Sequence, residues 1–360
     1  MAKKEFHNKP FDDGTLTKLA VFQLYVRSWL PVFVARHKLH WREVHLFDFF
    51  CGPGQDIEGT PGSPLLILEE LKAQATHLAR TGLSTYVHFY DGDKDSISEL
   101  EKHIDSSGLR LPNVNYDIQP GKFGDTFPKA SRILESKNTA CLVFLDQFGF
   151  KDVTEDAIRK LILCPTTDVM FFISSGLIGR MGDHPAIAKY LDVGKPEESH
   201  KGHLLALEHY RSLIPRGQRY FFMPFSIKKP SGVHGLIFGT GHPLGAEKFL
   251  EVAWKENELN GEANFDIHSD EEASRQLDLF EKRTTKIEVF EDMLETGLLD
   301  QSIKTEAGIY RFCIDSGMRP QHASSVLKKL KKEGKLECRW QTPNINSFLK
   351  GENRSFKITT

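Results

Sequence analysis

The chain has 360 residues and a mass of 40.9 kDa, and at about 100–200 residues per domain we expect two domains. Hydrophobic residues make up 39% and charged residues 27% of the chain, which excludes collagen and a wholly disordered chain. No apolar run approaches the roughly 18 residues of a membrane helix, and the five cysteines are scattered, so we expect neither a membrane span nor a disulfide framework. The N-terminus has no apolar signal core, which predicts a cytoplasmic protein.

Charge is divided unevenly along the chain. Residues 301–360 contain twelve Lys and Arg against five Asp and Glu, although the net charge of the whole chain is only −2. A basic segment on an acidic body predicts a polyanionic partner, because Lys and Arg near phosphates gain free energy by releasing condensed counterions. The alternative interpretation is a solvated lysine-rich helix that binds nothing.

The first predicted element is a long helix over residues 15–38, with a broad apolar face and a kink or break near Pro31. Short apolar runs then alternate with helical stretches. Five runs are predicted strands, at residues 44–50, 86–90, 114–118, 141–145 and 169–173. The predicted helices between them cover residues 64–80, 94–106, 123–135 and 154–163. These repeats predict a parallel sheet with helices on both faces, because parallel strands need crossover connections.

The sixth and seventh predicted strands break this rhythm. Residues 219–228 and 233–239 are separated by the turn at residues 229–232, which is too short for a crossover and predicts an antiparallel hairpin. Five parallel strands that end in an antiparallel pair are typical of class I S-adenosylmethionine (SAM) methyltransferases. We therefore predict an α/β, Rossmann-like, seven-stranded sheet of this class over residues 1–255.

The last hundred residues have a different pattern. Residues 256–285 are rich in acids and predict a linker. Three predicted helices (287–296, 305–316 and 320–333) and two short strands (335–340 and 355–359) then predict a winged helix-turn-helix over residues 286–360 that binds nucleic acid. The candidate phosphate contacts are basic residues of the third helix and its flanks, namely Arg319, Lys328, Lys329, Lys331, Lys332 and Lys335.

A glycine-containing turn follows the first predicted strand. The segment from Asp48 to Gly54 reads DFFCGPG, and Gly52 and Gly54 let the backbone turn tightly and approach a ligand that a β-carbon would exclude. SAM enzymes carry an acid followed by three alternating glycines here, and Phe50 replaces the first glycine. With Cys51, these residues are the candidate cofactor turn. The alternative is a tight connecting turn without a ligand.

Two later positions are further candidates for cofactor contacts. Ser63, followed by Pro64, is the predicted N-cap of the next helix, whose N-terminus would face the methionine carboxylate of SAM. Asp91, with Asp93 as the second choice, ends the second strand, where a carboxylate accepts two hydrogen bonds from a ribose diol. A solvated turn is the alternative for both aspartates.

The fourth predicted strand ends in FLDQFGF. Amino-group methyltransferases have a polar-Pro-Pro-aromatic stretch here that holds the target nitrogen and stacks on a base. Asp146 fits the polar role and Phe148 or Phe150 the aromatic role, but Gln147 occupies a proline position. The alternative is that Asp146 only caps the following helix. No CxxC or HxxxH pair predicts a metal site.

These motifs together resemble the three-Cys-motif partner family of bacterial proteins. The likeness is carried by residues 47–54, 62–65, 144–149 and 239–245, and the winged helix is similar to one attached to some members. The resemblance implies a SAM-dependent methyltransferase that works with a dedicated protein partner containing a three-cysteine motif. We therefore expect SAM as cofactor and DNA or RNA as the partner of the basic domain. The alternative is a catalytically inactive, nucleic-acid-binding regulatory subunit with a vestigial or sensing nucleoside pocket.

Overall fold

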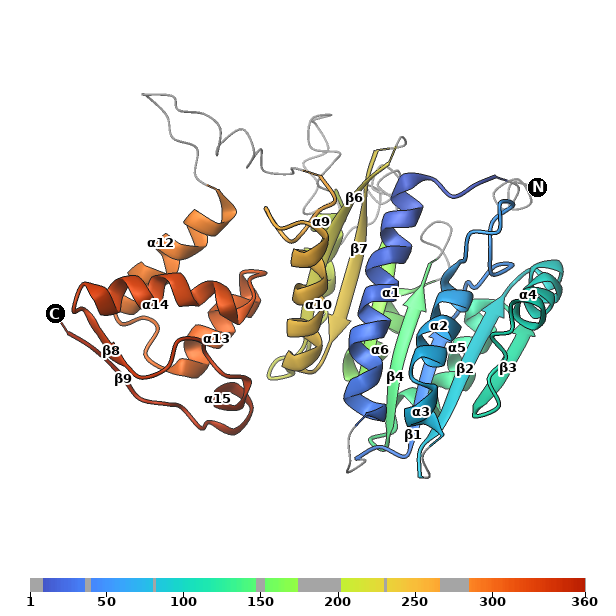
Figure 1. Cartoon of the computed structure of the whole chain (residues 1–360), viewed down its shortest axis with the longest axis horizontal. Coiled ribbons are helices and arrows are strands. Elements are labelled where there is room, and N and C mark those ends of the chain that lie inside the picture. The colour runs from blue at the N-terminus through green and yellow to red at the C-terminus, as the bar shows by residue number, and fades with distance from the viewer. Residues whose placement is uncertain are drawn as a thin grey trace. The chain divides into compact units, whose positions relative to one another are not determined.

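The computed structural model describes residues 9–35, 40–79, 82–146, 153–173, 202–229, 232–265 and 285–359. The chain divides into two compact units, Met1–His242 and Pro243–Thr360 (Figure 1). This division lies earlier than the predicted boundary after residue 255, because helix α10 (Pro243–Glu256) belongs to the second unit.

The first unit is built on a seven-stranded sheet with the order β3-β2-β1-β4-β5-β7-β6. The strands are β1 (Glu43–Asp48), β2 (Ser84–Asp91), β3 (Val114–Pro120), β4 (Thr139–Leu145), β5 (Thr167–Ile173), β6 (Phe221–Lys229) and β7 (Gly232–Thr240). Strands β1 to β5 pair in parallel, and β7 pairs antiparallel with both β5 and β6. The predicted fold class, five parallel strands followed by an antiparallel hairpin, is confirmed.

Helices cover both faces of this sheet. They are α1 (Asp13–Val34), α2 (Ser63–Ala73), α3 (Ala75–Leu78), α4 (Lys94–Ser107), α5 (Phe123–Leu134), α6 (Glu155–Leu163) and α9 (Gly202–Ser212). Helices α1 and α2 lie side by side, and Phe22 of α1 stacks on Phe144 of β4 with ring centroids 4.1 Å apart (Figure 1). On the other face, α5, α6 and α9 share one apolar core with β1, β4 and β5. No helix within the described ranges has the length and apolarity needed to span a bilayer.

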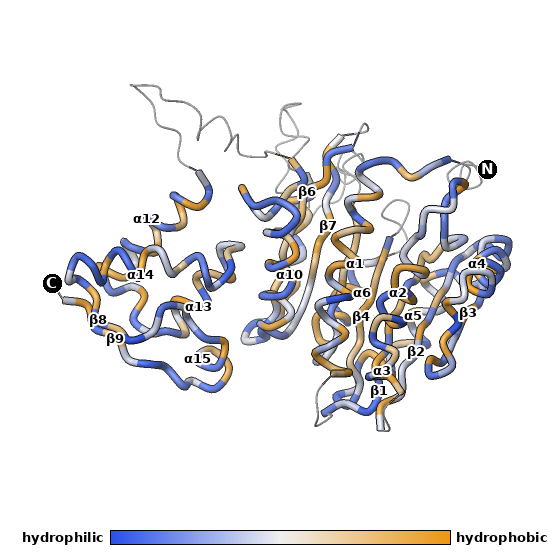
Figure 2. The backbone as a smooth tube through the Cα atoms, viewed as in Figure 1, coloured by the Kyte–Doolittle hydropathy of each residue, from blue (hydrophilic) through white to orange (hydrophobic). Residues whose placement is uncertain are grey.

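The central and edge strands of the sheet differ in hydropathy, as their positions require. Strand β4 is buried at every residue and is mainly orange in Figure 2, whereas β3 at the edge is buried only at Val114 and is largely blue and white. Each large apolar side chain that is fully buried contributes about 1.5–3 kcal/mol, so the central strands supply most of the free energy that holds the sheet together. Pro31 lies inside α1 and does not end it.

The second unit contains the predicted three helices and two-stranded wing. Its elements after α10 are α12 (Lys286–Leu299), α13 (Glu306–Asp315), the 3₁₀ helix η3 (Pro320–His322), α14 (Ala323–Lys332), β8 (Leu336–Cys338), α15 (Ile345–Lys350) and β9 (Phe356–Ile358). Strands β8 and β9 pair antiparallel. Helix α15 lies in the segment that was predicted to be a polar loop, so the wing carries an extra short helix.

Helix α10 belongs to the second unit through Trp254, whose side chain is 2% exposed. The Trp254 indole N–H donates to the Gly317 carbonyl at 2.9 Å, and its ring lies 4.3 Å from that of His322. The Lys286 ammonium lies 5.4 Å from the Trp254 ring centroid and also donates to the Asn260 carbonyl. The first part of the predicted linker is therefore folded onto this unit, and residues 266–284 lie outside the described residues.

Candidate functional site

Three of the predicted site aspartates lie at the ends of three adjacent parallel strands. Asp48 is the last residue of β1, Asp91 is the last residue of β2, and Asp146 directly follows β4. Strand β1 lies between β2 and β4, so the strand order reverses there. In open α/β sheets, ligands bind outside the carboxyl ends of the strands at such a reversal. The sheet topology therefore brings the predicted cofactor and acceptor residues to one edge.

The turn after β1 needs glycine at two positions. The φ angles of Gly52 and Gly54 are 57° and 87°, in the left-handed region that favours glycine. A β-carbon on Gly54 would also lie 2.5 Å from Cδ1 of Leu100 on α4. At Gly54 the requirement thus comes from the backbone and from Leu100, rather than from the ligand approach that the sequence predicted.

Asp48 is fully buried beneath this turn. Its carboxylate accepts a hydrogen bond from the Ser63 hydroxyl at 2.5 Å and one from the Phe50 amide at 3.1 Å. Burial raises the pKa of Asp48 to about 7, against the lowering effect of these two hydrogen bonds. The negative charges of Asp146 and Asp91 raise the pKa of Asp48 further, by smaller amounts than burial does.

The predicted capping role of Ser63 is wrong. Helix α2 begins at Ser63, its N-cap is Gly62, and no side chain caps it. The Ser63 hydroxyl donates to Asp48 instead, because its own position is already inside the first turn and its side chain faces the end of β1. Ser63 lies beside Asp48 only in the folded chain, because the two residues are 15 positions apart in the sequence.

Asp91 ties the glycine-containing turn to the end of β2. Its carboxylate accepts hydrogen bonds from the Gly52 amide at 3.2 Å and from the Asp93 amide at 2.8 Å. The Asp93 side chain caps α4, where it accepts from the Asp95 amide at 3.2 Å and from the Ser96 hydroxyl at 3.0 Å. Of the two predicted ribose-binding candidates, Asp91 is therefore the one joined to the turn.

Two more turn residues are fixed by neighbouring strands. The Cys51 amide donates to the Tyr90 carbonyl at 3.0 Å, and the thiol is buried, which raises its pKa well above its ordinary value. The half-buried Phe50 ring stacks on Phe123 at the start of α5 with centroids 5.8 Å apart. Phe50, which replaces the first glycine of the SAM pattern, thus joins the turn to the segment after β3.

Asp146 forms an ion pair with Lys18 of α1, whose side chain is only 6% exposed. The next helix, α6, is capped by Thr154, which accepts from the Ala157 amide, so Asp146 does not cap it. Phe148, the predicted base-stacking ring, and Gln147 lie outside the described residues.

The sequence analysis missed two lysines and an aromatic ring beside Asp146. The ammonium groups of Lys18 and Lys229 lie 4.8 and 5.3 Å from the ring centroid of Phe172 at the end of β5. Lys229 also donates to the Thr15 hydroxyl at 2.8 Å, which ties the start of α1 to the end of β6. No sequence signal identifies Lys18 as the partner of Asp146, because their contact depends on how α1 lies on the sheet.

The predicted nucleic-acid contacts on the second unit divide into two groups. Lys329 pairs with Glu295 at 2.6 Å, Lys331 donates to the Trp340 carbonyl at 2.6 Å, and Lys335 pairs with Glu333 at 2.7 Å. Arg319 is also engaged, because its guanidinium lies 3.2 Å from the His322 ring nitrogen.

Lys328 and Lys332 form the second group. Both are exposed on α14, and neither makes an ion pair or side-chain hydrogen bond within the described ranges. They are the two predicted contacts whose charges are not engaged by any residue in the described part of the chain.

The fold and these residues define the class: a sheet of the class I methyltransferase topology joined to a winged helix-turn-helix. A family model described as a GMT-like wHTH domain matches residues 265–343, which agrees with the second unit. Curated proteins give no match to the chain. The described residues include no group of three or more His, Cys, Asp or Glu side chains suited to hold a metal ion.

Among solved structures, the chain is similar to a SAM-dependent methyltransferase from Agrobacterium tumefaciens, with 10% identity, a TM-score of 0.31, and coverage of 61% of this chain and 60% of that one. A methyltransferase from Geobacter sulfurreducens has 12% identity, a TM-score of 0.31, and coverage of 66% and 82%. The P. horikoshii protein TYW2 in complex with MeSAdo has 11% identity, a TM-score of 0.28, and coverage of 64% and 62%.

The chain thus spans less than two thirds of the length of the Agrobacterium and P. horikoshii proteins. All of these identities and TM-scores are low. The class of the first unit therefore rests on its own strand order and not on these matches.

Proposed function

We propose that the chain is a SAM-dependent methyltransferase that acts on nucleic acid. The observation that carries this proposal is the meeting of Asp48, Asp91 and Asp146 at the strand-order reversal, with Asp91 bonded to the amide of Gly52. A glycine-containing turn and a strand-end carboxylate at this place suit a nucleoside whose ribose needs two hydrogen-bond acceptors.

The residues present fit SAM. When bound, SAM supplies an electrophilic methyl group on a cationic sulfonium, and an acidic edge suits that charge. A carboxylate can accept several hydrogen bonds, and that of Asp91 already accepts them from the amides of Gly52 and Asp93, which fixes it at the end of β2 where a ribose would lie. The proposed cofactor residues are Asp48, Phe50, Cys51, Gly52, Gly54, Ser63 and Asp91, with Asp93 supporting Asp91 through its amide.

Asp146 is the proposed acceptor-holding residue, with Phe148 as the ring that stacks on the target base. The ion pair with Lys18 fixes the Asp146 carboxylate at the end of β4, where it can accept a hydrogen bond from an amino group. A base within a duplex must be extruded to reach this position. Lys18 and Lys229 are then positioned to contact the substrate beside the base.

The second unit is the proposed nucleic-acid-binding part. Its match to a wHTH family model and its exposed Lys328 and Lys332 support this role. The resemblance to three-Cys-motif partner proteins adds a protein partner with that motif. We place the protein in the cytoplasm, where its five cysteines would remain reduced.

A second candidate function keeps the fold without the chemistry. In this reading the chain is a nucleic-acid-binding regulatory subunit with a vestigial or sensing nucleoside pocket. The specific observation in its favour is that Lys18 already engages Asp146, so the acceptor-holding carboxylate has a partner in the absence of substrate. Gln147 at a proline position points the same way.

Calorimetry with SAM and with its demethylated product tests the cofactor site. We expect the full chain to bind both, Asp91→Ala to weaken binding at least tenfold, and Asp93→Ala to retain it. Asp93→Ala is the matched control because its side chain caps α4, whereas its amide still donates to Asp91. No heat with either nucleoside would overturn the cofactor site.

Methyl transfer separates the two candidate functions. Tritium from labelled SAM should enter DNA or RNA when the full chain and its three-Cys-motif partner are mixed with both, and Asp146→Ala should abolish this. SAM binding without any incorporation would favour the regulatory subunit. Incorporation that survives in Asp146→Ala would remove Asp146 from the acceptor site.

A further inference from the structure

A chain of hydrogen bonds crosses three strands on the α5 face of the sheet, away from the strand-end aspartates. Nε2 of His45 on β1 lies 3.1 Å from a Glu43 oxygen, and Nδ1 of His45 lies 3.0 Å from Nε2 of His88 on β2. Nδ1 of His88 in turn lies 3.2 Å from a carboxylate oxygen of Asp117 on β3. The two histidines are 3% and 6% exposed, so water cannot readily replace these contacts.

This series of hydrogen bonds contains too few protons if both imidazole rings are neutral. It has three contacts, and each needs one hydrogen between its two heavy atoms. Two neutral imidazoles supply one N–H each, and two carboxylates supply none. One contact would then bring two lone pairs to about 3 Å inside the protein, which is strongly unfavourable. One additional proton satisfies all three contacts.

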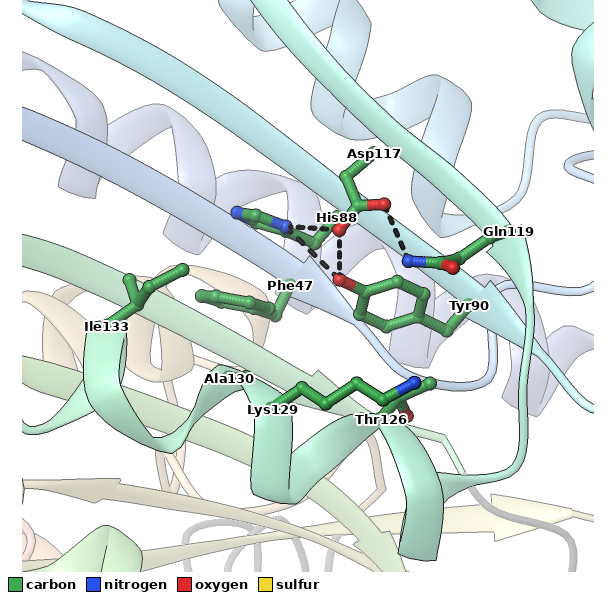
Figure 3. Close-up of a pocket in the computed structure, with 9 residues that line it drawn as sticks. All are labelled: Phe47, His88, Tyr90, Asp117, Gln119, Thr126, Lys129, Ala130 and Ile133. Carbon is green, nitrogen blue, oxygen red and sulfur yellow. Dashed lines mark hydrogen bonds and ion pairs between the residues drawn. The ribbon is translucent and has the colours of Figure 1, made fainter.

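Tyr90 does not supply the missing proton. Its hydroxyl donates to Asp117 in a short hydrogen bond and also lies 3.3 Å from Nδ1 of His88 (Figure 3). Burial and the bond to Asp117 raise the pKa of Tyr90, so its one proton stays on the hydroxyl. Gln119 donates its amide to the other Asp117 oxygen at 2.8 Å.

The surroundings allow one extra proton and oppose a second. Burial, followed by the charge of His88, lowers the pKa of His45 to about 4, although its hydrogen bond to Glu43 raises it. His45 therefore does not take up a second proton of its own, and the hydrogen on its Nε2 points toward Glu43. The pKa of Asp117 lies below its ordinary value, and the largest cause is its hydrogen bond with His88.

The remaining groups around the pair do not change this count. Tyr86 stacks on His45 at 4.5 Å, and Cys141 faces His45 from β4, where burial raises the pKa of its thiol to about 12 and keeps it neutral. From α5, Lys129 lines the same pocket as His88. This pocket has a volume of about 120 Å³ and lies between the strands and α5 (Figure 3). This pocket gives Asp117, at one end of the series of hydrogen bonds, access to solvent.

We propose that His45 and His88 form a proton-binding site that holds one shared excess proton between Glu43 and Asp117. Both ends of the chain are open to exchange, because the side chains of Glu43 and Asp117 are 42% and 41% exposed. Loss of the proton breaks one of the three contacts: the two rings separate, or His45 changes tautomer and releases Glu43, or His88 changes tautomer and releases Asp117. The site thereby makes the side-chain contacts between β1, β2 and β3 on this face sensitive to pH.

Nitrogen NMR on the full chain labelled with ¹⁵N-histidine counts these protons directly, because protonated and bare ring nitrogens have different chemical shifts. At pH 6 we expect three of the four ring nitrogens of the pair to carry a proton. As pH rises, the pair should lose one of its three ring protons in a single step that the nitrogens of both rings report. Spectra of His45→Gln and His88→Gln provide the assignments, and neutron crystallography gives the same count if these variants do not fold.

Glu43→Gln removes one of the flanking charges and should move the shared step to lower pH by about one unit or more. Glu99→Gln is the matched control, since it makes the same change of charge at an exposed position on α4 and should leave the step in place. A count of two or of four ring protons at pH 6 would overturn the proposal. So would two separate steps, or a step that Glu43→Gln does not move.

Discussion

The strand-end site of the first unit and the basic face of the second unit hold their charges in opposite ways. At the strand ends, Asp48 and Asp91 are buried and accept hydrogen bonds from the backbone amides of Phe50 and Gly52, in the glycine-containing turn. On the basic face, Lys329 and Lys335 are exposed and pair with other side chains. Backbone partners follow from where a strand ends, whereas side-chain partners follow from which helices meet. The first arrangement is therefore far easier to predict from sequence.

The largest expected effect tests whether a buried, ionised carboxylate at the strand ends lowers the stability of the folded protein. In the folded protein the pKa of Asp48 is raised to about 7, from an ordinary value of 3.8. Between these two pH values the folded protein therefore holds a proton that the unfolded chain has released. Stability from this group should therefore fall as pH rises from 4 to 7. Asp48→Asn does not titrate, so its free energy of unfolding should rise relative to wild type by about 4 kcal/mol across this range.

Urea unfolding at pH 4 and pH 8 measures this difference. A value that stays constant between the two pH values would mean that Asp48 is charged in the folded protein at low pH. The hydrogen bonds from the Phe50 amide and the Ser63 hydroxyl would then stabilise the Asp48 carboxylate more than burial destabilises it. The charges of the strand-end site, like those of the basic face, would then cost the folded protein little stability.

The next effect tests how tightly the glycine-containing turn is packed. Gly54→Val should destabilise the first unit by about 3–4 kcal/mol, because it adds backbone strain and a clash with Leu100 to one position. Gly59→Val is the matched control, with a φ of 83° but no heavy atom within 4 Å of a β-carbon. Its loss should be about 1–2 kcal/mol, from strain alone. Equal losses in urea unfolding would show that Leu100 can move aside.

The sequence predicted the sheet and its strand ends because buried parallel strands are short apolar runs that stop at turn residues. This placed Asp48, Asp91 and Asp146 at one edge before any contact was known. It could not predict Lys18 at Asp146 or the engagement of Ser63 by Asp48, because these depend on how α1 and α2 lie on the sheet. The sequence also did not assign α10 to the second unit, since Trp254 meets its partners only in the folded chain.

A buried charge in the second unit offers a direct comparison with Asp48. Glu306 is fully buried at the start of α13. Its carboxylate accepts hydrogen bonds from the amides of Asn344 and Arg354 and from the Arg354 guanidinium. These bonds fasten the segments on either side of α15 to α13. Arg354→Met leaves this carboxylate without its cation and should cost about 3 kcal/mol. Urea unfolding measures it, and Arg311→Met, whose partner Asp315 is exposed, should cost under about 1 kcal/mol. Equal costs would mean that the amides alone hold Glu306.

The smallest effect concerns which lysines of α14 meet a polyanion. Lys328 and Lys332 have no partner within the described residues, so replacing both by Gln should reduce the slope of log affinity against log salt by up to about 1.8 for a duplex. Lys329→Gln with Lys331→Gln removes the same charge, but these side chains already engage Glu295 and the Trp340 carbonyl, so the slope should change less. Fluorescence anisotropy with a short labelled DNA duplex, repeated with RNA, measures both pairs. Equal slopes would show that the contacts of Lys329 and Lys331 within the protein open when nucleic acid binds. The salt dependence would then depend on the number of lysines on the basic face and not on their partners in the free protein.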